Sequence, residues 1–578
     1  MTNIRPGKLA LRAVNQYRRR DVLSYLGLRY YLGNSAARSD HWIETIATNL
    51  SLTREVSYYP VEHFKEITNE GKIKHRKIFL PSPNDSLAET VLLNECARYP
   101  DVFTNPRSVF SYDLSEAELN SGVFRPYIQG LKRRQSAIAL ACRKYPDGVV
   151  EHTDIQNFYP SISTDFAIKT WLAKCGETQM EPKFVQLGER LIKSYRSIID
   201  GHESTSVLVG PMFSHFLANI ILHDLDLEFQ KGLPASYFRY VDDMTFVGNE
   251  KDVIASIDIV KAKLEEIGLH LHAEGSPKNI KGSTSDWLKY RNNFNDHDEH
   301  NKSWKNFIGA IKIHLLNNPD DFMVLEKELR RQDIGVPLFQ YKMLVKERSS
   351  FEKLKSYPKL FWYWIKSLSI TVESIVEDAK YLRDRYIREV EQLMSEFRES
   401  EGFNRKSAIP KIRYRLGRIL YLSSDEQIQK LAISIDGVEE FRFYQALIES
   451  MLSGNIDTVL NLGADVAQAA AQIFKAINKE VYFEDKNVSD LRSHGIAIFL
   501  LNGVSIKSFQ EPISELQKLA SKGADLELMN SESPFIREIA CLHGIQEAPR
   551  HSKTLESVFD EDEDFVFDAL DGFYISLS

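Results

Sequence analysis

The segment SYFRYVDDMTFVG (236–248) places the acidic pair Asp242-Asp243 between two short runs of aromatic and β-branched residues. Such runs favour strands, and Asp tolerates the backbone of a tight turn. We therefore predict a β-hairpin that carries both carboxylates at the end of a sheet. Taken alone, the pattern also fits a surface hairpin with a solvated acidic tip, since the dipeptide recurs at Asp320-Asp321.

A second acidic residue, Asp154, ends another β-rich run in GVVEHTDIQNFYPSI (148–162). Two strand ends that carry carboxylates favour a shared metal site, because Mg²⁺ prefers a few carboxylate oxygens together with water and substrate phosphates. A pair of such ions can bind the attacking and leaving oxygens of an in-line displacement at phosphorus. The two segments together predict a site for nucleotidyl transfer.

The length of 578 residues predicts several domains, each able to bury a core. Hydrophobic residues make up 43% of the chain, and no run approaches the roughly 18 apolar residues of a membrane span, so no membrane partner is expected. The four cysteines form no CxxC pair, which argues against a zinc site or a disulfide framework. We predict a reducing compartment, the cytoplasm.

The net charge of −8 is unevenly distributed. Residues 554–571 hold eight acids and no base, whereas residues 1–80 hold fourteen Lys or Arg against seven Asp or Glu, and residues 125–144 add six bases without an acid. Local positive surfaces attract phosphate, so RNA and DNA are expected partners. Each basic cluster can equally be the solvated face of a helix. The acidic end is expected to be a disordered tail or a docking peptide.

The sequence pattern changes near residue 315. Before it, β-rich runs such as HRKIFLPSP (75–83) and GLHLHAE (268–274) lie among helical stretches, which is typical of an α+β domain. After it, amphipathic helices predominate, with an apolar stripe formed by Ile375, Ala379, Leu382, Tyr386, Val390, Leu393 and Phe397. Gly-Ala-Asp recurs at 463–465 and 523–525, which would fit stacked helical repeats. We predict four parts: a basic helical segment over 1–50, an α+β domain over 51–315, an all-α domain over 316–553 and an acidic tail over 554–578.

The chain resembles a bacterial reverse transcriptase, related to those of retrons and group II introns, at two motifs. DIQNFYPSI is similar to the family's first catalytic motif, and FRYVDDMTFVG is similar to its YxDD motif. The resemblance implies a right-hand polymerase with fingers and palm over 51–315, and two Mg²⁺ ions, replaceable by Mn²⁺, at Asp154, Ile155, Asp242 and Asp243. It also implies that Tyr159 is the steric gate that excludes a ribose 2′-hydroxyl, so that dNTPs are the substrates. A core tyrosine is the alternative role for Tyr159.

Between these motifs the chain departs from the family pattern. The usual Pro-Gln-Gly segment is replaced by LVGPMFSHFLA (208–218), which keeps Gly210 and Ser214 but has Val209 in place of Gln. This form, together with SVFSY at 108–112, resembles the abortive-infection and other phage-defence reverse transcriptases. It implies antiviral defence in a bacterial cytoplasm and a homo-oligomer, and it leaves open whether a noncoding RNA is a further partner. Val209 leaves both RNA-templated copying and untemplated or protein-primed synthesis open.

Further positions are similar to the family's nucleotide-binding residues. Lys74 and Arg76 match fingers residues that hold the triphosphate, a role that suits the bidentate geometry of Arg. Lys278 matches a lysine that protonates pyrophosphate, and residues 307–309 match a turn that grips the primer, although both can equally be surface features. The expected nucleotide-binding set is Lys74, Arg76, Phe158, Tyr159, Gly210, Ser214 and Lys278.

The alternative function belongs to a different class: a nucleic-acid-binding sensor or scaffold that keeps a polymerase fold without activity. The intact acids at 154, 242 and 243 argue against it, because a degenerate palm is expected to lose at least one metal ligand. No ribonuclease H or integrase-like group of residues is recognisable in the helical part.

Overall fold

A computed structural model of the 578-residue chain describes most of the sequence. The described residues are 7–17, 23, 27–28, 31–32, 36–68, 70–115, 122–195, 197–199, 202–204, 206–273, 275–276, 278–294, 303–336, 370–485, 489–507, 512–522 and 526–544. The expected acidic tail and the second Gly-Ala-Asp lie outside them. In the described part, no helix is both long and apolar enough to cross a membrane.

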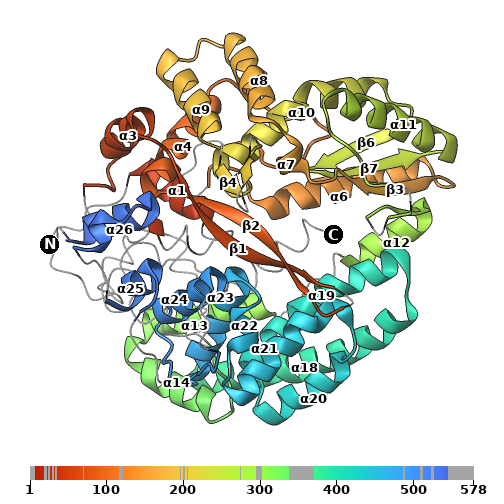
Figure 1. Ribbon diagram of the computed structural model, residues 1–578. Helices are drawn as coiled ribbons and strands as arrows, with labels where there is room; N and C mark the ends of the chain where they lie inside the picture. Colours follow the sequence, from red (N-terminus) through yellow and green to blue (C-terminus); the bar gives the residue numbers. More distant parts are fainter. Residues whose placement is uncertain are drawn as a thin grey trace.

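The centre of the amino-terminal half is a four-stranded antiparallel sheet in the order β6-β7-β3-β8 (Figure 1). Its strands are β6 (Ser236–Tyr240), β7 (Asp243–Gly248), β3 (Val149–Asp154) and β8 (Ile280–Ser283). β6 and β7 form the hairpin predicted around Asp242, and the register pairs Asp154 with Asp243. The sheet thus brings the two predicted acidic segments to one edge.

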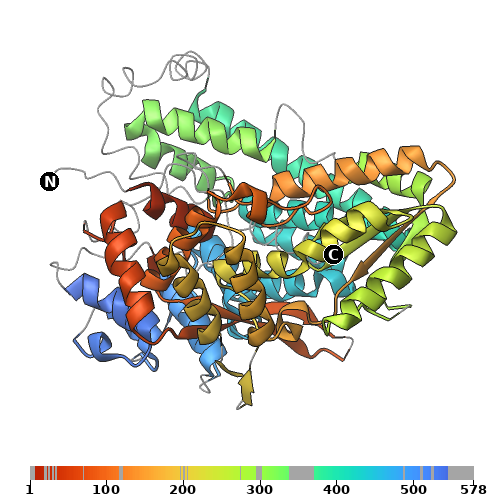
Figure 2. The same ribbon diagram turned by 90° about the horizontal axis from the view of Figure 1, so that it is seen from above.

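Helices cover both faces of this sheet, because its side chains alternate between two apolar layers. Val150 and Val247 share a cluster with α6 (Tyr127–Lys144) and α12 (Thr284–Phe294). Met244 and Phe246 share a cluster with α10 (Met212–Gly232) and α11 (Glu250–Glu266). Figures 1 and 2 show the sheet between α6 and α11. This mixed layer agrees with the α+β prediction.

The remaining helices of this half share the core of the sheet. They are α1 (Lys8–Tyr17), the π-helix η1 (Trp42–Ala47), α3 (Thr48–Thr53), α4 (Pro83–Cys96), α5 (Pro100–Phe103), α7 (Phe158–Ser161), α8 (Thr164–Gly176) and α9 (Pro182–Ser194). Two short strands, β4 (Ser197–Ile199) and β5 (His202–Ser204), form a separate ladder. Val14 of α1 lies in the same apolar cluster as Leu92 and Leu217, so the basic amino-terminal segment belongs to this body.

The long hairpin of β1 (Tyr58–Ile67) and β2 (Ile73–Pro81) lies between the two halves of the molecule (Figure 1). Its Val61, Phe64 and Ile78 belong to the core of the helical half. The Phe64 N–H donates to Asp465 Oδ1 at 2.9 Å. Gly463 has φ +124°, and a Cβ there would lie 2.7 Å from the Phe64 nitrogen, so the close approach requires glycine. The hairpin and the helical half therefore form a common core.

The helical half runs from α13 to the last described residues. It contains α13 (Trp304–Asn317), η2 (Pro319–Asp321), α14 (Phe322–Arg330), α18 (Val372–Glu399), α19 (Gly402–Leu422), α20 (Asp425–Ile435), η4 (Glu439–Phe441), α21 (Arg442–Ser453), α22 (Asp457–Leu460), α23 (Ala464–Ile477), α24 (Asp490–Leu501), α25 (Glu515–Lys522), η5 (Leu528–Asn530) and α26 (Pro534–Gly544). A capping box of Thr371 and Ser374 starts α18. The helix buries the predicted apolar stripe with one difference: Leu393 is only partly buried, and its neighbour Met394 is buried instead.

Three local expectations differ from the structure. Residues 307–309 lie inside α13, with Phe307 and Ile308 buried in the helical core, so they form no primer-gripping turn. Residues 268–274 contribute only a bridge between Leu271 and Ile155, because β8 pairs along the length of β3. The helical core includes residues before 315, since Trp304, Phe307 and Ile311 of α13 already belong to it.

The last described helix, α26, returns to the amino-terminal half. Glu538 forms an ion pair with Arg54, which also contacts Asp85 at 3.0 Å. Glu538 Oε2 accepts a hydrogen bond from the Asn84 N–H at 2.9 Å, at the start of α4.

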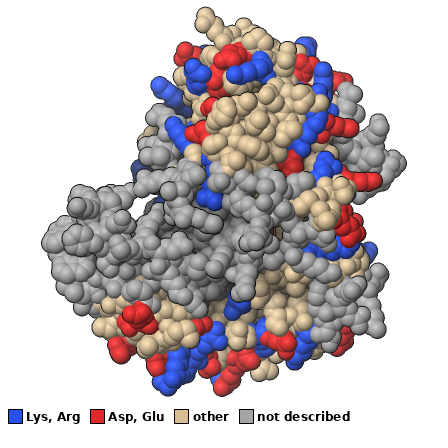
Figure 3. Space-filling model, turned by 90° about the vertical axis from the view of Figure 1, so that its left-hand side faces the viewer, with Lys and Arg blue, Asp and Glu red and all other residues tan. Residues whose placement is uncertain are grey.

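On the side shown in Figure 3, the described basic and acidic side chains are interspersed.

Candidate active site

The turn between β6 and β7 presents Asp242 beside the end of β3. Val241 adopts φ +58° in this turn. The Ile155 N–H donates to the Asp242 carbonyl at 3.2 Å, and the His272 N–H donates to the Asp154 carbonyl at 2.9 Å. These backbone bonds fix Asp154 and Asp242 on adjacent strand ends.

The Asp154 and Asp242 side chains are half-buried, and the negative charge of Asp154 disfavours the ionised form of Asp242. Burial and the charge of Asp154 raise the pKa of Asp242 to about 8. Burial also raises the pKa of Asp154, against the opposing effect of Lys278. Asp154 Oδ1 is buried without a hydrogen-bond partner among the described groups. A bound cation would relieve both the repulsion and the unsatisfied oxygen.

The chemistry of these donors fits a hard divalent cation. No three His, Cys, Asp or Glu side chains of the described residues are grouped to hold a metal ion by themselves. Mg²⁺, however, binds through one or two carboxylates and completes its shell with water and substrate phosphates. Asp154 and Asp242, with the Ile155 backbone carbonyl next to them, are the residues that would hold it.

Asp243 differs from the other two acids in its partner. Both of its carboxylate oxygens accept hydrogen bonds from the Arg134 guanidinium, each at 2.8 Å. Arg134 also donates to Thr245 Oγ1 at 2.6 Å, and its side chain is only 5% exposed. Asp243 does not line the cavity described below. The sequence analysis missed Arg134, although it falls on the inward stripe of α6 with Leu131 and Ile138, which are buried.

A cavity of about 520 Å³ opens in front of Asp154 and Asp242. Lys278 Nζ lies 3.7 Å from Asp154 Oδ2, and His272 Nε2 lies 4.0 Å from the same oxygen. The other basic and imidazole side chains that line the cavity are His63, Lys65, His75, Arg76, Lys77 and His215. A cavity that combines two acids with this many basic groups suits an anion that arrives with a metal cation.

Tyr159 lies in this cavity with a fixed ring. Its hydroxyl is 2.6 Å from His215 Nδ1, and the two rings meet edge to face. The ring of Tyr112 stacks on the imidazole of His215, with the two ring centroids 4.7 Å apart. Phe158, also predicted to bind nucleotide, lines the cavity beside Tyr159.

Gly210 lines the cavity at a position where the backbone conformation and the close approach of β2 require glycine. It has φ +129°, and a Cβ there would lie 2.4 Å from the Phe79 carbonyl oxygen. The Phe79 N–H donates to the Val209 carbonyl at 2.8 Å, so residue 210 must be small for β2 to approach. Gly210 therefore joins the β2 strand, which carries Arg76, to the start of α10.

Two expected nucleotide-binding residues lie outside the cavity. Lys74 is exposed and pairs across the hairpin with Glu66 at 2.8 Å, closer to the β1–β2 turn than Arg76. Ser214 is buried and donates its hydroxyl to the Pro211 carbonyl at 2.7 Å in the first turn of α10. Both side chains are thus occupied in holding local structure.

No protein-family model matches the sequence, and no curated protein matches it significantly. Among solved structures, the chain is similar to apo telomerase from Candida tropicalis, truncated from the C-terminal domain, with 12% identity and a TM-score of 0.25 over 42% of this chain and 55% of that one. It is also similar to telomerase from Candida albicans in complex with a telomeric RNA fragment, with 10% identity and a TM-score of 0.27 over 76% of this chain and 67% of that one. At such scores neither likeness bears on function, which rests on the site itself.

Proposed function

We propose that the chain is a Mg²⁺-dependent, reverse-transcriptase-like polymerase, a nucleotidyltransferase that builds DNA from dNTPs. The observation that carries this proposal is the half-buried pair of Asp154 and Asp242, with an unsatisfied Asp154 oxygen, in a cavity that also holds Arg76 and Lys278. The antiparallel sheet supplies both acids from adjacent strand ends. An acidic pair on a solvated hairpin tip would have neither this burial nor this basic surrounding.

In the proposed reaction, the 3′-hydroxyl of a primer attacks the α-phosphorus of a dNTP, and pyrophosphate leaves. A cation between Asp154 and Asp242 would lower the pKa of the attacking hydroxyl and offset charge on the leaving phosphates. Arg76 binds the triphosphate from β2, as a guanidinium can engage two phosphate oxygens. Lys278, adjacent to Asp154, protonates the departing pyrophosphate. Tyr159 contacts the sugar and excludes a 2′-hydroxyl.

The biological setting extends the proposal through the sequence motifs. Val209-Gly210-Pro211 and the segment 108–112 support a role in bacterial antiviral defence, in the cytoplasm. RNA or DNA, a noncoding RNA and further copies of the chain are the proposed partners. Sequencing the DNA product with and without added RNA distinguishes templated copying from untemplated or protein-primed synthesis.

Purified protein incubated with labelled dNTPs and Mg²⁺ provides the test. We expect incorporation that stops on chelation and returns with Mg²⁺ or Mn²⁺. Tight binding of RNA or DNA without incorporation, over varied templates, primers and metals, would contradict the polymerase proposal and favour an inactive sensor or scaffold.

A further inference from the structure

The turn that carries Asp242 has an unfavourable backbone. Val241 adopts φ +58°, in the left-handed region that β-branched residues rarely enter. Such a conformation persists only where surrounding contacts over-determine it. The contacts that hold Val241 therefore also set the direction in which the next residue, Asp242, enters the cavity.

Both polar backbone groups of Val241 have partners outside the turn. Its N–H donates to Ser111 Oγ at 2.9 Å, and its carbonyl accepts from Arg239 Nη1 at 2.7 Å. Ser111 is 1% exposed and Arg239 is fully buried. Neither bond depends on solvent, so the turn is fixed from both sides.

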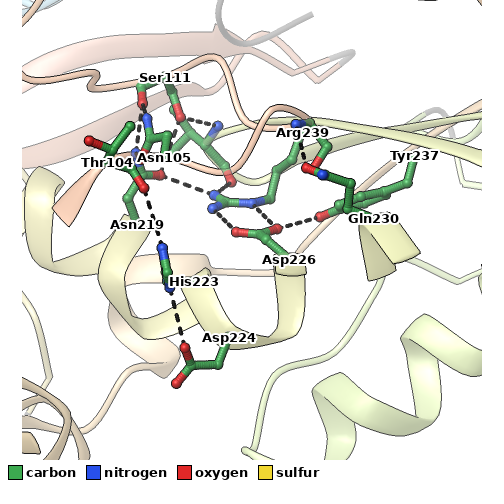
Figure 4. Close-up of polar contacts among 12 residues, drawn as sticks. Thr104, Asn105, Ser111, Asn219, His223, Asp224, Asp226, Gln230, Tyr237 and Arg239 are labelled. Carbon is green, nitrogen blue, oxygen red and sulfur yellow. Dashed lines mark hydrogen bonds and ion pairs between the residues drawn. The ribbon is translucent and has the colours of Figure 1, made fainter. Parts of the chain in front are cut away.

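The Arg239 guanidinium is itself fixed by a buried carboxylate. Nε and Nη2 donate to the two oxygens of Asp226, at 2.9 and 2.5 Å, and the Tyr237 hydroxyl donates to the same carboxylate at 2.9 Å. Figure 4 shows the guanidinium between Asp226 and Asn219. Asn219 Oδ1 accepts from Arg239 Nη1 at 3.1 Å, and its Nδ2 donates to the Ser111 carbonyl at 2.6 Å (Figure 4). The network thus closes on Ser111.

Residues 108–112, whose role the sequence left unassigned, run beside β6. The Arg239 N–H donates to the Ser108 carbonyl at 2.8 Å, and the Phe110 N–H donates to the Arg239 carbonyl at 3.1 Å. This segment therefore extends the sheet by one parallel bridge at its β6 edge. It places the Ser111 hydroxyl directly at the turn.

We propose that Ser111 and the Arg239–Asp226 pair are positioning residues that hold the Val241 turn so that Asp242 faces Asp154. The proposal rests on the proposed function only for the role of Asp242 in catalysis. Its physical content is independent of turnover: without the Ser111 bond, the two carboxylates bind a divalent cation less tightly.

The test compares two serine variants of the same segment. Ser111→Ala removes the bond to Val241 together with a hydrogen bond from the Ser111 hydroxyl to Asn219 Oδ1 at 3.3 Å. Ser108→Ala removes a hydroxyl that is also buried but contacts Gln230, at 3.4 Å. Mn²⁺ binding to the full chain is measured by calorimetry. The rate of incorporation is measured over a series of dNTP concentrations at several Mg²⁺ concentrations, which gives kcat and the KM for dNTP.

We expect Ser111→Ala to weaken Mn²⁺ binding about ten-fold and to lower kcat about ten-fold, with the KM for dNTP unchanged. Ser108→Ala should match the wild type in both. Equal Mn²⁺ affinities of the two variants would overturn the inference, even if both remain active. Mn²⁺ binding by a wild type that incorporates no dNTP would contradict the proposed function alone, and a wild type that binds no Mn²⁺ would overturn both.

Discussion

Arg134 Nη1 and Nη2 each lie 2.8 Å from an oxygen of Asp243, so this carboxylate is fully engaged by one guanidinium. Asp243 and Asp242 are adjacent in sequence but have different surroundings: Asp243 is paired with a guanidinium, whereas Asp242 lines the cavity beside Asp154. The sequence predicted a metal-binding role for both acids. Asp242 lines the cavity and is the acid to which we assign the catalytic role in the proposed function, whereas Asp243 anchors β7 to α6 through Arg134.

We therefore predict different consequences for the two Asp→Asn changes. Asp242→Asn should abolish dNTP incorporation with little loss of stability. Asp243→Asn should retain measurable incorporation but lower the free energy of unfolding by about 3 kcal/mol, because it leaves the Arg134 charge unpaired in a site that is nearly buried. Urea unfolding and incorporation assays on both variants check this. Equal loss of activity with equal stability would contradict the distinction.

Tyr159 and His215 make a prediction about sugar selection. Tyr159→Ala should raise the ratio of rNTP to dNTP incorporation by about ten-fold or more, since the ring no longer occupies the space of a 2′-hydroxyl. His215→Phe removes the 2.6 Å contact with the tyrosine hydroxyl and should shift the ratio in the same direction by less. Tyr127→Ala, another cavity tyrosine, is the matched control. A ratio that stays at the wild-type value in Tyr159→Ala would show that this residue is a core tyrosine.

His494 predicts a pH dependence of the contact between β1 and α24. Its Nε2 lies 3.0 Å from the Tyr59 hydroxyl, and burial lowers the pKa of His494 from 6.5 to about 4. Below about pH 6.5 this histidine binds a proton in the unfolded chain but stays neutral in the folded chain. Its contribution to the free energy of unfolding is therefore complete above pH 6.5 and is lost as the pH falls toward 4. Replacement by Gln should flatten this loss.

The measurement is urea unfolding of the wild type and His494→Gln at pH 7.5, 5.5 and 4.5. We expect the stability difference between the two proteins to shift by up to about 3 kcal/mol, in favour of the variant as the pH falls. A difference that does not change with pH would contradict the assignment of this histidine as neutral in the folded protein.

The acidic hairpin and the α18 stripe could be predicted because both depend on local periodicity. Aromatic and β-branched residues on each side of Asp242 specify β6 and β7, and three- and four-residue steps from Ile375 specify one face of α18. The register that pairs Asp154 with Asp243 was not predicted; only a shared site for the two acidic segments was.

Long-range pairings could not be predicted. Arg134 is one of several basic residues in α6, and the composition of the helix does not reveal which of them is buried. The three- and four-residue spacing of Arg134 from Leu131 and Ile138 places it on the buried face, but it does not identify Asp243 as its partner. The docking of β1–β2 onto α23 depends on Gly463 and Asp465, whose significance appears only when the two surfaces meet. Lys74 was predicted to bind nucleotide from a resemblance to fingers residues, and such a resemblance does not give its distance along β2 from the cavity.

The most direct measurement of the central claim compares incorporation by Asp242→Asn with that by Asp320→Asn. Each variant changes the first acid of an Asp-Asp pair, but Asp320 is exposed in η2 and does not line the cavity. We predict that Asp320→Asn incorporates labelled dNTP at the wild-type rate and that Asp242→Asn shows no incorporation above background. Equal incorporation by the two variants would contradict the assignment of Asp154 and Asp242 as the catalytic pair.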